Sequence, residues 1–480
     1  MKMGKMRKVL SVASEMVPLV KTGGLADVVG ALPGALAGQG WEMRVMIPAY
    51  RGVLKSLKAS KAVWKSPDLY GAPARLMQGK VGGTVVLALD APHLYDRAGG
   101  PYSDGGIDFV DNAERFAALC HVAAEVAGAG IAGWKPEIVH AHDWQTGLVP
   151  WYLRDSGIPT VITVHNIAFQ GRFAREKLAA MALKPADFER DGVEFWGDIS
   201  TLKAGLMAAD AITTVSPRYA DELMRPVFGM GLEGVMQLRA RDLHGILNGI
   251  DTTIWDPEVD PNIQPFSSGS LTGKEKNRNA LEGEFNLDVK GPLAILISRL
   301  TDQKGIDLIA PAIEPFLAAG GGLAVLGSGD RWAEAAMLDL ATRYPGQVGV
   351  KIGYDETLSH RMFGGGDAVL VPSRFEPCGL TQLYGLRYGC LPVVAAVGGL
   401  ADTVIGASPA TQAAKAATGV VFHPVDALAL QQGLLKLVAL YEDRAQWRAM
   451  VRRAMKQDWG WAQSASRYGA LYDTLISNAD

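Results

Sequence analysis

Short apolar runs rich in β-branched residues alternate along the chain with longer amphipathic segments rich in Ala and Leu. This alternation predicts repeated strand–helix units built around parallel sheets. The strands predicted in the first half are residues 8–14, 44–48, 84–90, 137–142, 160–165 and 211–216. Those predicted in the second half are residues 292–300, 322–329, 348–354, 368–373 and 391–397.

A polar passage rich in Pro, Gly and Ser, from Asp256 to Gly273, lies between the two series of strands. Each series has enough chain to bury a core of its own, so the sequence predicts two α/β domains. We place the first at residues 1–246 and the second at residues 247–456. A final segment, residues 457–480, is predicted to be a helix.

That final segment carries Trp461, Tyr468 and Tyr472 on one helical face. We interpret this aromatic stripe as a packing surface, because aromatic residues at helical spacing are more often core than ligand platforms.

Composition narrows the function classes. The chain of 480 residues has 47 Lys and Arg against 50 Asp and Glu, a net charge of −3. This balance disfavours a nucleic-acid binder, which needs a basic excess. The three cysteines form no Cys-x-x-Cys pair, which indicates a reducing compartment and hence a cytoplasmic location. No uncharged apolar run reaches about 18 residues, so no membrane span is predicted.

The loop after the first predicted strand combines a cation with glycines. Lys21 precedes Gly23 and Gly24; the glycines allow close approach of a ligand, and the lysine suits phosphate. A plain glycine turn with a solvated lysine is the alternative. Glycine makes up 56 of the 480 residues, above the usual ~7%, and we expect the excess in ligand-binding loops. Neither a Walker loop nor a dinucleotide fingerprint occurs, which disfavours an NTPase or an oxidoreductase.

Arg299 and Lys304 lie at and just beyond the end of a strongly apolar strand. A guanidinium and an ammonium so placed could bind a diphosphate from two sides and stabilise charge on a leaving group. Further on, Glu376 precedes a predicted helix that begins around Gly379 to Thr381. A carboxylate beside a phosphate-attracting helix end suits glycosyl transfer through an oxocarbenium-like state. A solvated loop carboxylate is the alternative.

Polar residues end two predicted strands of the first half. Asp143 follows one of them, and His165 and Asn166 follow the next, so we expect all three at the rim of the sheet. His140 and His142 could suggest a metal site, but neighbouring strand residues face opposite ways and no further ligand cluster is evident. We therefore favour a structural role. The chain has no Asp-x-Asp pair, which predicts metal-independent chemistry.

Three smaller signals concern ligand contacts. Tyr95 and Tyr354 each follow a strand and could stack on a base, although burial is the commoner fate of a tyrosine. Asn248 could hydrogen-bond a sugar hydroxyl or form a turn. Cys378 has no base partner, and we do not predict that it is a nucleophile.

Eight motifs together resemble the family of bacterial glycogen synthases and plant starch synthases. In chain order they are KTGGLADV, DAPHLYDR, VHAHDW, TVHN, SRLTDQKG, IGYDE, PSRFEPCGLTQLYGLRYG and GGLADTV. The resemblance implies an α/β architecture of two facing Rossmann-like domains, the glycosyltransferase-B fold, with an interdomain active-site cleft. It also implies that the C-terminal helix, residues 457–480, packs back on the first domain.

For function, the resemblance implies transfer of glucose from ADP-glucose to the non-reducing-end 4-hydroxyl of an α-1,4-glucan such as glycogen. The anomeric configuration would be retained, and no metal or other cofactor would be needed. A related transferase using UDP-glucose or another acceptor is the alternative. The expected partners are thus ADP-glucose and a glucan primer, with no nucleic acid and no membrane.

The resemblance also implies residue roles. Lys21, Arg299 and Lys304 would bind the diphosphate, with Asp27 beside the nucleotide and Tyr95 and Tyr354 near the adenine. The implied catalytic residues are Glu376, Arg299, Lys304, His165 and Asp143. The implied substrate-binding residues are Lys21, Gly23, Gly24, Asp27, Tyr95, Asn166, Asn248, Tyr354, Cys378, Gly379, Leu380 and Thr381.

The chain departs from the family pattern in one loop. Ala396 and Val397 replace the usual Arg and Thr before Gly398 and Gly399, so only backbone donors from the glycines are expected there. A glucan-binding protein without activity would have no reason to retain all four charged residues Lys21, Arg299, Lys304 and Glu376. A phosphorylase with pyridoxal phosphate would need a Schiff-base lysine, for which no segment is a candidate.

Overall fold

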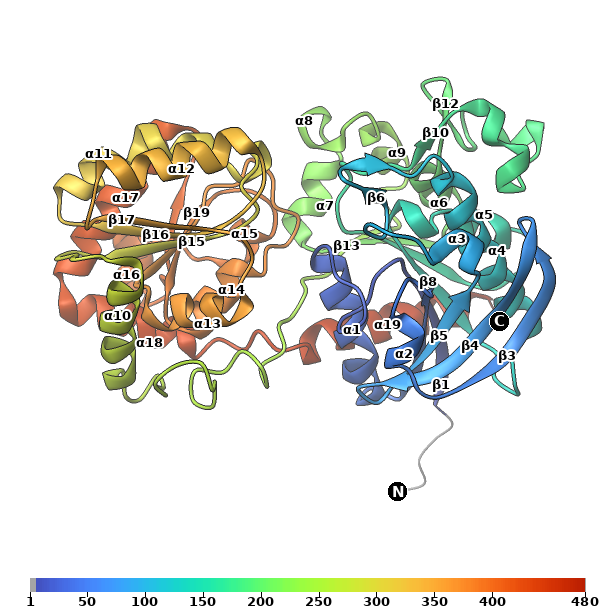
Figure 1. Cartoon of the computed structure of the whole chain (residues 1–480), viewed down its shortest axis with the longest axis horizontal. Coiled ribbons are helices and arrows are strands. Elements are labelled where there is room, and N and C mark those ends of the chain that lie inside the picture. The colour runs from blue at the N-terminus through green and yellow to red at the C-terminus, as the bar shows by residue number, and fades with distance from the viewer. Residues whose placement is uncertain (1–5, 480) are drawn as a thin grey trace. The chain divides into compact units, whose positions relative to one another are not determined.

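The computed structural model describes residues 6–479 and divides the chain into two compact units (Figure 1). Unit 1 runs to Gly249 and also includes the stretch from Trp461 onward, and unit 2 is Ile250–Gly460. The sequence prediction placed these divisions after residues 246 and 456. Asn248 therefore belongs to unit 1, and not to the second domain to which it was assigned.

Unit 1 is built on a nine-stranded sheet in the order β14-β13-β9-β8-β1-β2-β5-β4-β3. The strands are β1 (Arg7–Val12), β2 (Trp41–Pro48), β3 (Lys58–Leu69), β4 (Ala72–Val81), β5 (Thr84–Asp90), β8 (Ile138–His142), β9 (Thr160–Val164), β13 (Ala211–Thr214) and β14 (Leu243–Gly245). The run from β14 to β5 is parallel, and β4 and β3 extend it as an antiparallel pair. Sequence reasoning missed β3, β4 and the three-residue strand β14. Strand β3 is a largely exposed edge strand with three lysines, and such polar edges lack an apolar run.

The helices of unit 1 are α1 (Gly24–Ala37), α2 (Val53–Ser56), α3 (Pro92–Tyr95), α4 (Asn112–Ala129), α5 (Leu148–Leu153), α6 (Thr201–Ala208), α7 (Pro217–Leu223), α8 (Pro226–Gly229), α9 (Glu233–Leu238) and α19 (Ala462–Ala479). Two-residue strands occur at β6 (Ser103–Asp104), β7 (Ile107–Asp108), β10 (Arg172–Phe173) and β11 (Glu194–Phe195), and β12 is Asp198–Ser200. Short 3-10 helices lie at Trp144–Thr146, Arg175–Lys177, Ala179–Met181 and Pro185–Asp187.

Helix α19 packs against the sheet of unit 1. Tyr468 and Tyr472 are completely buried, in one apolar cluster with Leu32 and Leu36 of α1 and Val9 of β1. The prediction that the aromatic stripe is a packing surface is confirmed.

Unit 2 contains a fully parallel six-stranded sheet in the order β17-β16-β15-β18-β19-β20. The strands are β15 (Leu293–Ile297), β16 (Gly322–Gly327), β17 (Val348–Ile352), β18 (Ala368–Val371), β19 (Leu391–Ala395) and β20 (Val420–Phe422). Each of the five strands predicted for this half overlaps one of them. Strand β20 was missed because it has only three residues.

Helices cover both faces of the unit 2 sheet (Figure 1). They are α10 (Thr272–Phe285), α11 (Ile309–Ala318), α12 (Arg331–Arg343), α13 (Glu356–Gly365), α14 (Thr381–Arg387), α15 (Gly398–Thr403), α16 (Pro409–Ala413), α17 (Ala427–Glu442) and α18 (Arg444–Met455), with 3-10 helices at Asp302–Lys304 and Ile306–Leu308. Asp355 and Asp426 cap α13 and α17 by accepting a backbone N–H of the first turn.

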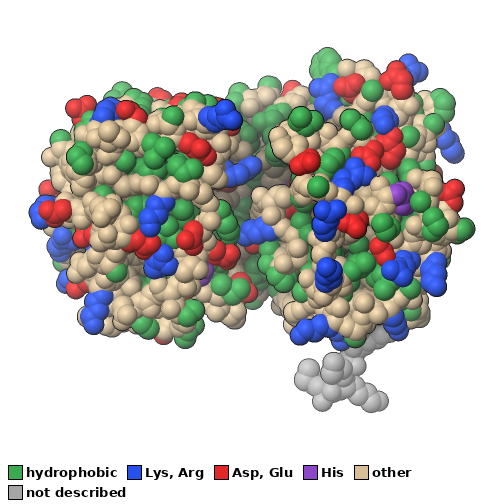
Figure 2. Space-filling model, in the orientation of Figure 1, with side chains coloured by type: hydrophobic (Ala, Val, Ile, Leu, Met, Phe, Trp, Pro, Cys, Tyr) green, Lys and Arg blue, Asp and Glu red, His purple; other side chains and the backbone are tan. Residues whose placement is uncertain are grey.

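The surface carries charges of both signs. On the face shown in Figure 2, Lys and Arg side chains are interspersed with Asp and Glu side chains on both units. Across residues 6–479, no helix combines the length and the apolar character that a membrane crossing requires.

Candidate functional site

The predicted polar residues lie where open α/β sheets bind ligands. Such sheets take ligands beyond the carboxyl ends of the strands, at the point where the strand order changes direction. In unit 1 this point is at β1, which lies between β8 and β2; in unit 2 it is at β15, between β18 and β16. The loops after β1 and β8 carry Lys21 and Asp143, and those after β15 and β18 carry Lys304 and Glu376.

The loop after β1 leads into α1 and carries an ion pair. Lys21 Nζ lies 2.8 Å from Asp27 Oδ1, and both side chains are partly exposed. Asp27 stands in the first turn of α1, where a negative charge is favourable. A Cβ added at Gly23 or Gly24 would meet nothing within 4 Å. Packing of this unit therefore does not require glycine at either position, which leaves the backbone open to a ligand.

A buried acid that sequence reasoning missed holds this loop. Glu15 is 3% exposed and accepts a hydrogen bond of 2.5 Å from the Thr22 hydroxyl. Its carboxylate also accepts from the Thr22 backbone N–H and from the Tyr102 hydroxyl. The available signal was its position: an acid directly after an apolar strand needs buried partners.

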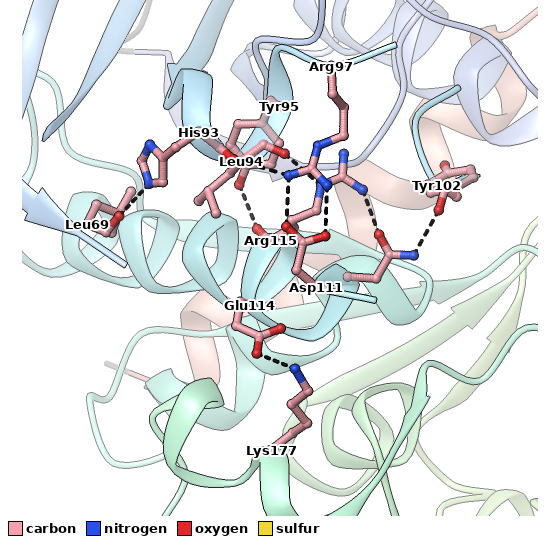
Figure 3. Close-up of polar contacts among 11 residues, drawn as sticks. Leu69, His93, Leu94, Tyr95, Arg97, Tyr102, Asp111, Glu114, Arg115 and Lys177 are labelled. Atoms are coloured by element: carbon pink, nitrogen blue, oxygen red, sulfur yellow. Dashed lines mark hydrogen bonds and ion pairs between the residues drawn. The ribbon is translucent and has the colours of Figure 1, made fainter. Parts of the chain in front are cut away.

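Tyr95 does not lie where a base could stack on it. The side chain is 1% exposed, and its hydroxyl donates to the Arg115 carbonyl oxygen at 2.6 Å (Figure 3). The Tyr50 ring packs edge-on against it, with a centroid separation of 6.0 Å, and burial raises the pKa of Tyr95 well above its usual range. The structure contradicts the predicted contact between Tyr95 and adenine, because the ring belongs to the core of unit 1.

Asp143 is held in an unusual backbone conformation after β8. Its φ is 55° and its ψ is −169°, a combination that costs a residue other than glycine strain energy. The Oδ1 atom accepts from the His165 backbone N–H at 2.7 Å. Burial raises the pKa of Asp143 to about 7. The strained backbone thus places a carboxylate at the rim of the sheet without a Lys or Arg partner among the described residues.

Three histidines of unit 1, His140, His142 and His165, are buried and uncharged. Burial lowers the pKa of His165 to about 3, and that of His140 to about 3. His140 is held between the Tyr472 hydroxyl at 2.7 Å and the Thr163 hydroxyl at 2.6 Å. Within residues 6–479, no three His, Cys, Asp or Glu side chains are grouped so that they could hold a metal ion. The structural interpretation of His140 is confirmed.

Asn166 and Asn248 differ in whether their side-chain oxygens accept a hydrogen bond from a described residue. Asn166 Oδ1 accepts the Ala168 backbone N–H at 3.0 Å, a local turn. Asn248 is 6% exposed, and no described residue donates to its buried Oδ1. A buried acceptor without a donor is rare, so Asn248 has an unused hydrogen-bonding position that a ligand hydroxyl would fill.

In unit 2, the predicted cation and the predicted carboxylate form a direct pair. Lys304 Nζ lies 2.5 Å from Glu376 Oε2, and the Ser373 hydroxyl donates to the same oxygen at 2.8 Å. Glu376 is 7% exposed, so it is not the solvated loop carboxylate of the alternative interpretation. Arg299 is exposed, and within residues 6–479 it forms no ion pair.

The second double-glycine loop supports Glu376. Gly399 N–H donates to the Glu376 carbonyl oxygen at 3.1 Å, and a Cβ at Gly399 would lie 2.1 Å from the Cys378 carbonyl oxygen. The backbone donor expected from Gly399 is therefore not available to a ligand. Its N–H is already bonded, and glycine is needed there because the two backbone segments touch.

The remaining predicted residues of unit 2 follow β17 and β18. Gln382 Nε2 donates to the carbonyl oxygens of Cys378 at 3.0 Å and Gly379 at 2.8 Å, which fixes the turn before α14. Leu380 caps this helix and Thr381 begins it. Tyr354 follows β17 with a ring that is 78% exposed, in contrast to the buried Tyr95.

Sequence comparisons decide the family. Residues 8–238 match the family described as "Starch synthase catalytic domain", and residues 277–454 match "Glycosyl transferases group 1". A glycogen synthase of Cereibacter sphaeroides is 58% identical over 98% of this chain and 99% of its own length. A glycogen synthase of Jannaschia sp. is 56% identical over 97% of this chain and 99% of its own length. The chain belongs to the glycogen and starch synthase family.

A solved structure of this glycosyltransferase family extends the match to the fold. The catalytic domain of starch synthase IV from Arabidopsis thaliana, bound to ADP and acarbose, aligns with a TM-score of 0.88 and 30% identity. It covers 98% of this chain and 100% of its own chain. The fold is thus the glycosyltransferase-B fold with two Rossmann-like units, as predicted. The residue roles implied by the family resemblance remain predictions, apart from the contact of Tyr95.

Proposed function

We propose that this family member transfers glucose from ADP-glucose to the 4-hydroxyl at the non-reducing end of an α-1,4-glucan, with retention of the anomeric configuration. The observation that carries the proposal is the cluster of charged residues in the loops after β15 and β18. There an exposed arginine and a lysine that contacts a buried carboxylate stand at the ligand-binding edge of a parallel sheet.

These groups match the charges that the reaction develops. As the sugar–phosphate bond breaks, negative charge grows on the diphosphate, and the guanidinium of Arg299 and the ammonium of Lys304 would stabilise it. Positive charge grows on the sugar ring, and the carboxylate of Glu376, at 2.5 Å from Lys304 Nζ, would stabilise that charge. Lys304 and Glu376 would thus act as a unit.

A front-face mechanism needs no protein base. The acceptor hydroxyl attacks from the side on which the nucleotide leaves, and a departing phosphate oxygen takes the proton. We further propose that no metal takes part, because Arg299 and Lys304 supply the positive charge on the diphosphate and the chain has no Asp-x-Asp pair.

Unit 1 would bind sugar. The orphaned Oδ1 of Asn248 suits a sugar hydroxyl donor, and uncharged His165 suits a second hydroxyl. Lys21 and the open glycine pair at Gly23 and Gly24 suit a phosphate. The preference for an adenine nucleotide finds support in the Arabidopsis relative, whose structure was solved with ADP and acarbose.

The test is nucleotide release from labelled ADP-glucose and UDP-glucose with glycogen as the acceptor, with and without a chelator. We expect ADP release that depends on glycogen and is unaffected by chelation, and label that α-glucosidase but not β-glucosidase removes. Release from UDP-glucose alone would overturn the donor assignment, and inhibition by chelator would overturn the metal-free mechanism. No release from either donor would overturn the transferase assignment.

A further inference from the structure

A polar chain runs through the core of unit 1 and ends at His165. In the sheet, Ser11 of β1 lies opposite His140 of β8, and His142 lies opposite Thr163 of β9. Side chains two residues apart on a strand share a face, so Ser11, His140 and His142 lie on one face of the sheet. Ser11 is 1% exposed and His142 is 0% exposed, so both are buried.

Two hydrogen bonds link Ser11 to His165 through His142. Ser11 Oγ lies 3.1 Å from His142 Nε2, and His142 Nδ1 lies 3.0 Å from His165 Nε2. His165 is 9% exposed, so the chain begins in the core and ends at the rim of the sheet. Each bond needs one proton between its two atoms, and the positions of these protons follow from which groups have another partner.

The proton of Ser11 fixes the rest of the chain. Within the described residues, His142 Nε2 is the only acceptor in reach of this buried hydroxyl. A buried donor without an acceptor is costly, so Ser11 donates and His142 Nε2 accepts. A neutral imidazole carries one proton, which in His142 is then on Nδ1. His142 Nδ1–H donates in turn to His165 Nε2.

The same rule places the proton of His165. Because its Nε2 accepts, neutral His165 carries its proton on Nδ1. No described residue lies within hydrogen-bonding distance of that nitrogen. Burial lowers the pKa of both histidines, which keeps both rings neutral in the functional pH range.

We propose that Ser11 and His142 are positioning residues that hold His165 in the Nδ1–H tautomer, so that it presents a hydrogen-bond donor to a hydroxyl oxygen of the transferred sugar. The inference rests on the proposed function for the identity of the ligand. The protonation pattern follows from contacts within unit 1 alone. The opposite tautomer would present an unprotonated nitrogen, which could only accept.

Asn and Gln at position 142 separate positioning from packing. The amide group of an asparagine reaches the Nδ1 position of a histidine and can place its NH2 donor there, and the amide group of a glutamine reaches the Nε2 position and can place its oxygen there to accept from Ser11. His142→Asn therefore keeps the donor to His165, whereas His142→Gln removes it and keeps a partner for Ser11. His140→Asn is the matched control, because His140 is equally buried on the same strand but bonds to Tyr472 and Thr163.

The first measurement is steady-state kinetics of the full chain with ADP-glucose and glycogen, together with thermal unfolding of every variant. We expect His142→Gln to lower kcat/KM about 10- to 100-fold, as for the loss of one buried hydrogen-bond partner. We expect Ser11→Ala to have a smaller effect in the same direction. His142→Asn should restore most of the activity, although it unfolds at a similar temperature to His142→Gln.

The second measurement uses monodeoxy analogues of the glucosyl donor. The analogue that lacks the bonded hydroxyl should be a poor substrate for the wild type, and His142→Gln should discriminate against it much less. Equal losses in His142→Gln, His142→Asn and His140→Asn would overturn the proposal and indicate packing alone. Unchanged discrimination in His142→Gln would also overturn it. If the wild type transfers no glucose, the proposed function fails instead. Neutron diffraction would then still test the tautomer.

Discussion

The two sheet edges hold their carboxylates in opposite ways. In unit 2, Glu376 is buried and forms an ion pair of 2.5 Å with Lys304. In unit 1, Asp143 is buried without such a cation, and burial raises its pKa to about 7. One edge thus pairs its carboxylate with a cation, and the other carries a carboxyl group that can exist in both protonation states near neutral pH. This difference suits an edge that stabilises charge and an edge that handles neutral hydroxyls.

The two glycine pairs differ in the same sense. Gly23 and Gly24 have open space where a side chain would be, whereas Cβ atoms at Gly398 and Gly399 would lie 2.0 Å and 2.1 Å from backbone oxygens. The first pair leaves room for a ligand, and the second lets one protein segment rest on another. The same Gly-Gly dipeptide therefore has a different role at each position, and the surrounding residues determine that role.

The largest expected effect comes from breaking the ion pair in unit 2. Lys304→Ala removes a cation from the proposed diphosphate site and leaves the carboxylate of Glu376 buried without its partner. We expect kcat to fall by about 10²- to 10³-fold, as for other groups that stabilise transition-state charge. Circular dichroism should show that the fold survives.

Lys21→Ala is the matched variant in unit 1. Its ion pair with Asp27 is partly exposed and contributes little to stability, so we expect mainly a higher KM for the donor. A near-normal kcat for Lys304→Ala would contradict the charge-stabilising role proposed for the unit 2 edge.

The next largest effect is expected from alanine substitutions in the two glycine pairs, which should respond differently. Gly399→Ala would force the Glu376 segment away from α15, which costs about 1–3 kcal/mol for overpacking and about 10²-fold in rate for a displacement near 1 Å. Gly23→Ala should change stability by less than about 0.5 kcal/mol, since φ is −158° and no atom lies within 4 Å. Its effect should be confined to a higher KM for the donor.

Thermal unfolding and steady-state kinetics on both variants check this pair. A Gly399→Ala enzyme with the wild-type unfolding temperature and kcat would contradict the supporting role of the second pair. A Gly23→Ala enzyme with unchanged KM would contradict close approach of the donor to the first.

The sequence was sufficient to predict where the loops are, but not what surrounds each residue. Apolar runs predict strands, and strand ends predict the rim, so Asp143, His165, Lys304 and Glu376 could be found from the sequence. The pairing of Lys304 with Glu376 spans 72 residues and depends on the adjacency of β15 and β18, which local pattern does not reveal. Tyr95 was misplaced for the same reason: its hydroxyl bonds to the backbone carbonyl oxygen of Arg115 in α4, 20 residues further along the chain.

The smallest expected effect concerns the titration of Asp143. With its pKa raised from 3.8 to about 7, native Asp143 retains a proton that the unfolded chain releases between these pH values. The native state binds more protons there, so the free energy of unfolding should decrease as pH rises from about 4 to about 7. Above pH 7, Asp143 is ionised in both the native and the unfolded state. Its unfavourable contribution to the free energy of unfolding then no longer depends on pH.

Asp143→Asn removes this cost while it keeps the shape and an oxygen that accepts the His165 N–H. We therefore expect the variant to exceed the wild type in free energy of unfolding by about 4 kcal/mol at pH 8, with little difference near pH 4. Denaturant titrations at the two pH values check this, and kcat should fall although stability rises. An equal difference at both pH values would mean that packing, and not charge, distinguishes the two side chains. The contrast between an edge with a paired carboxylate and an edge with a titrating one would then be lost.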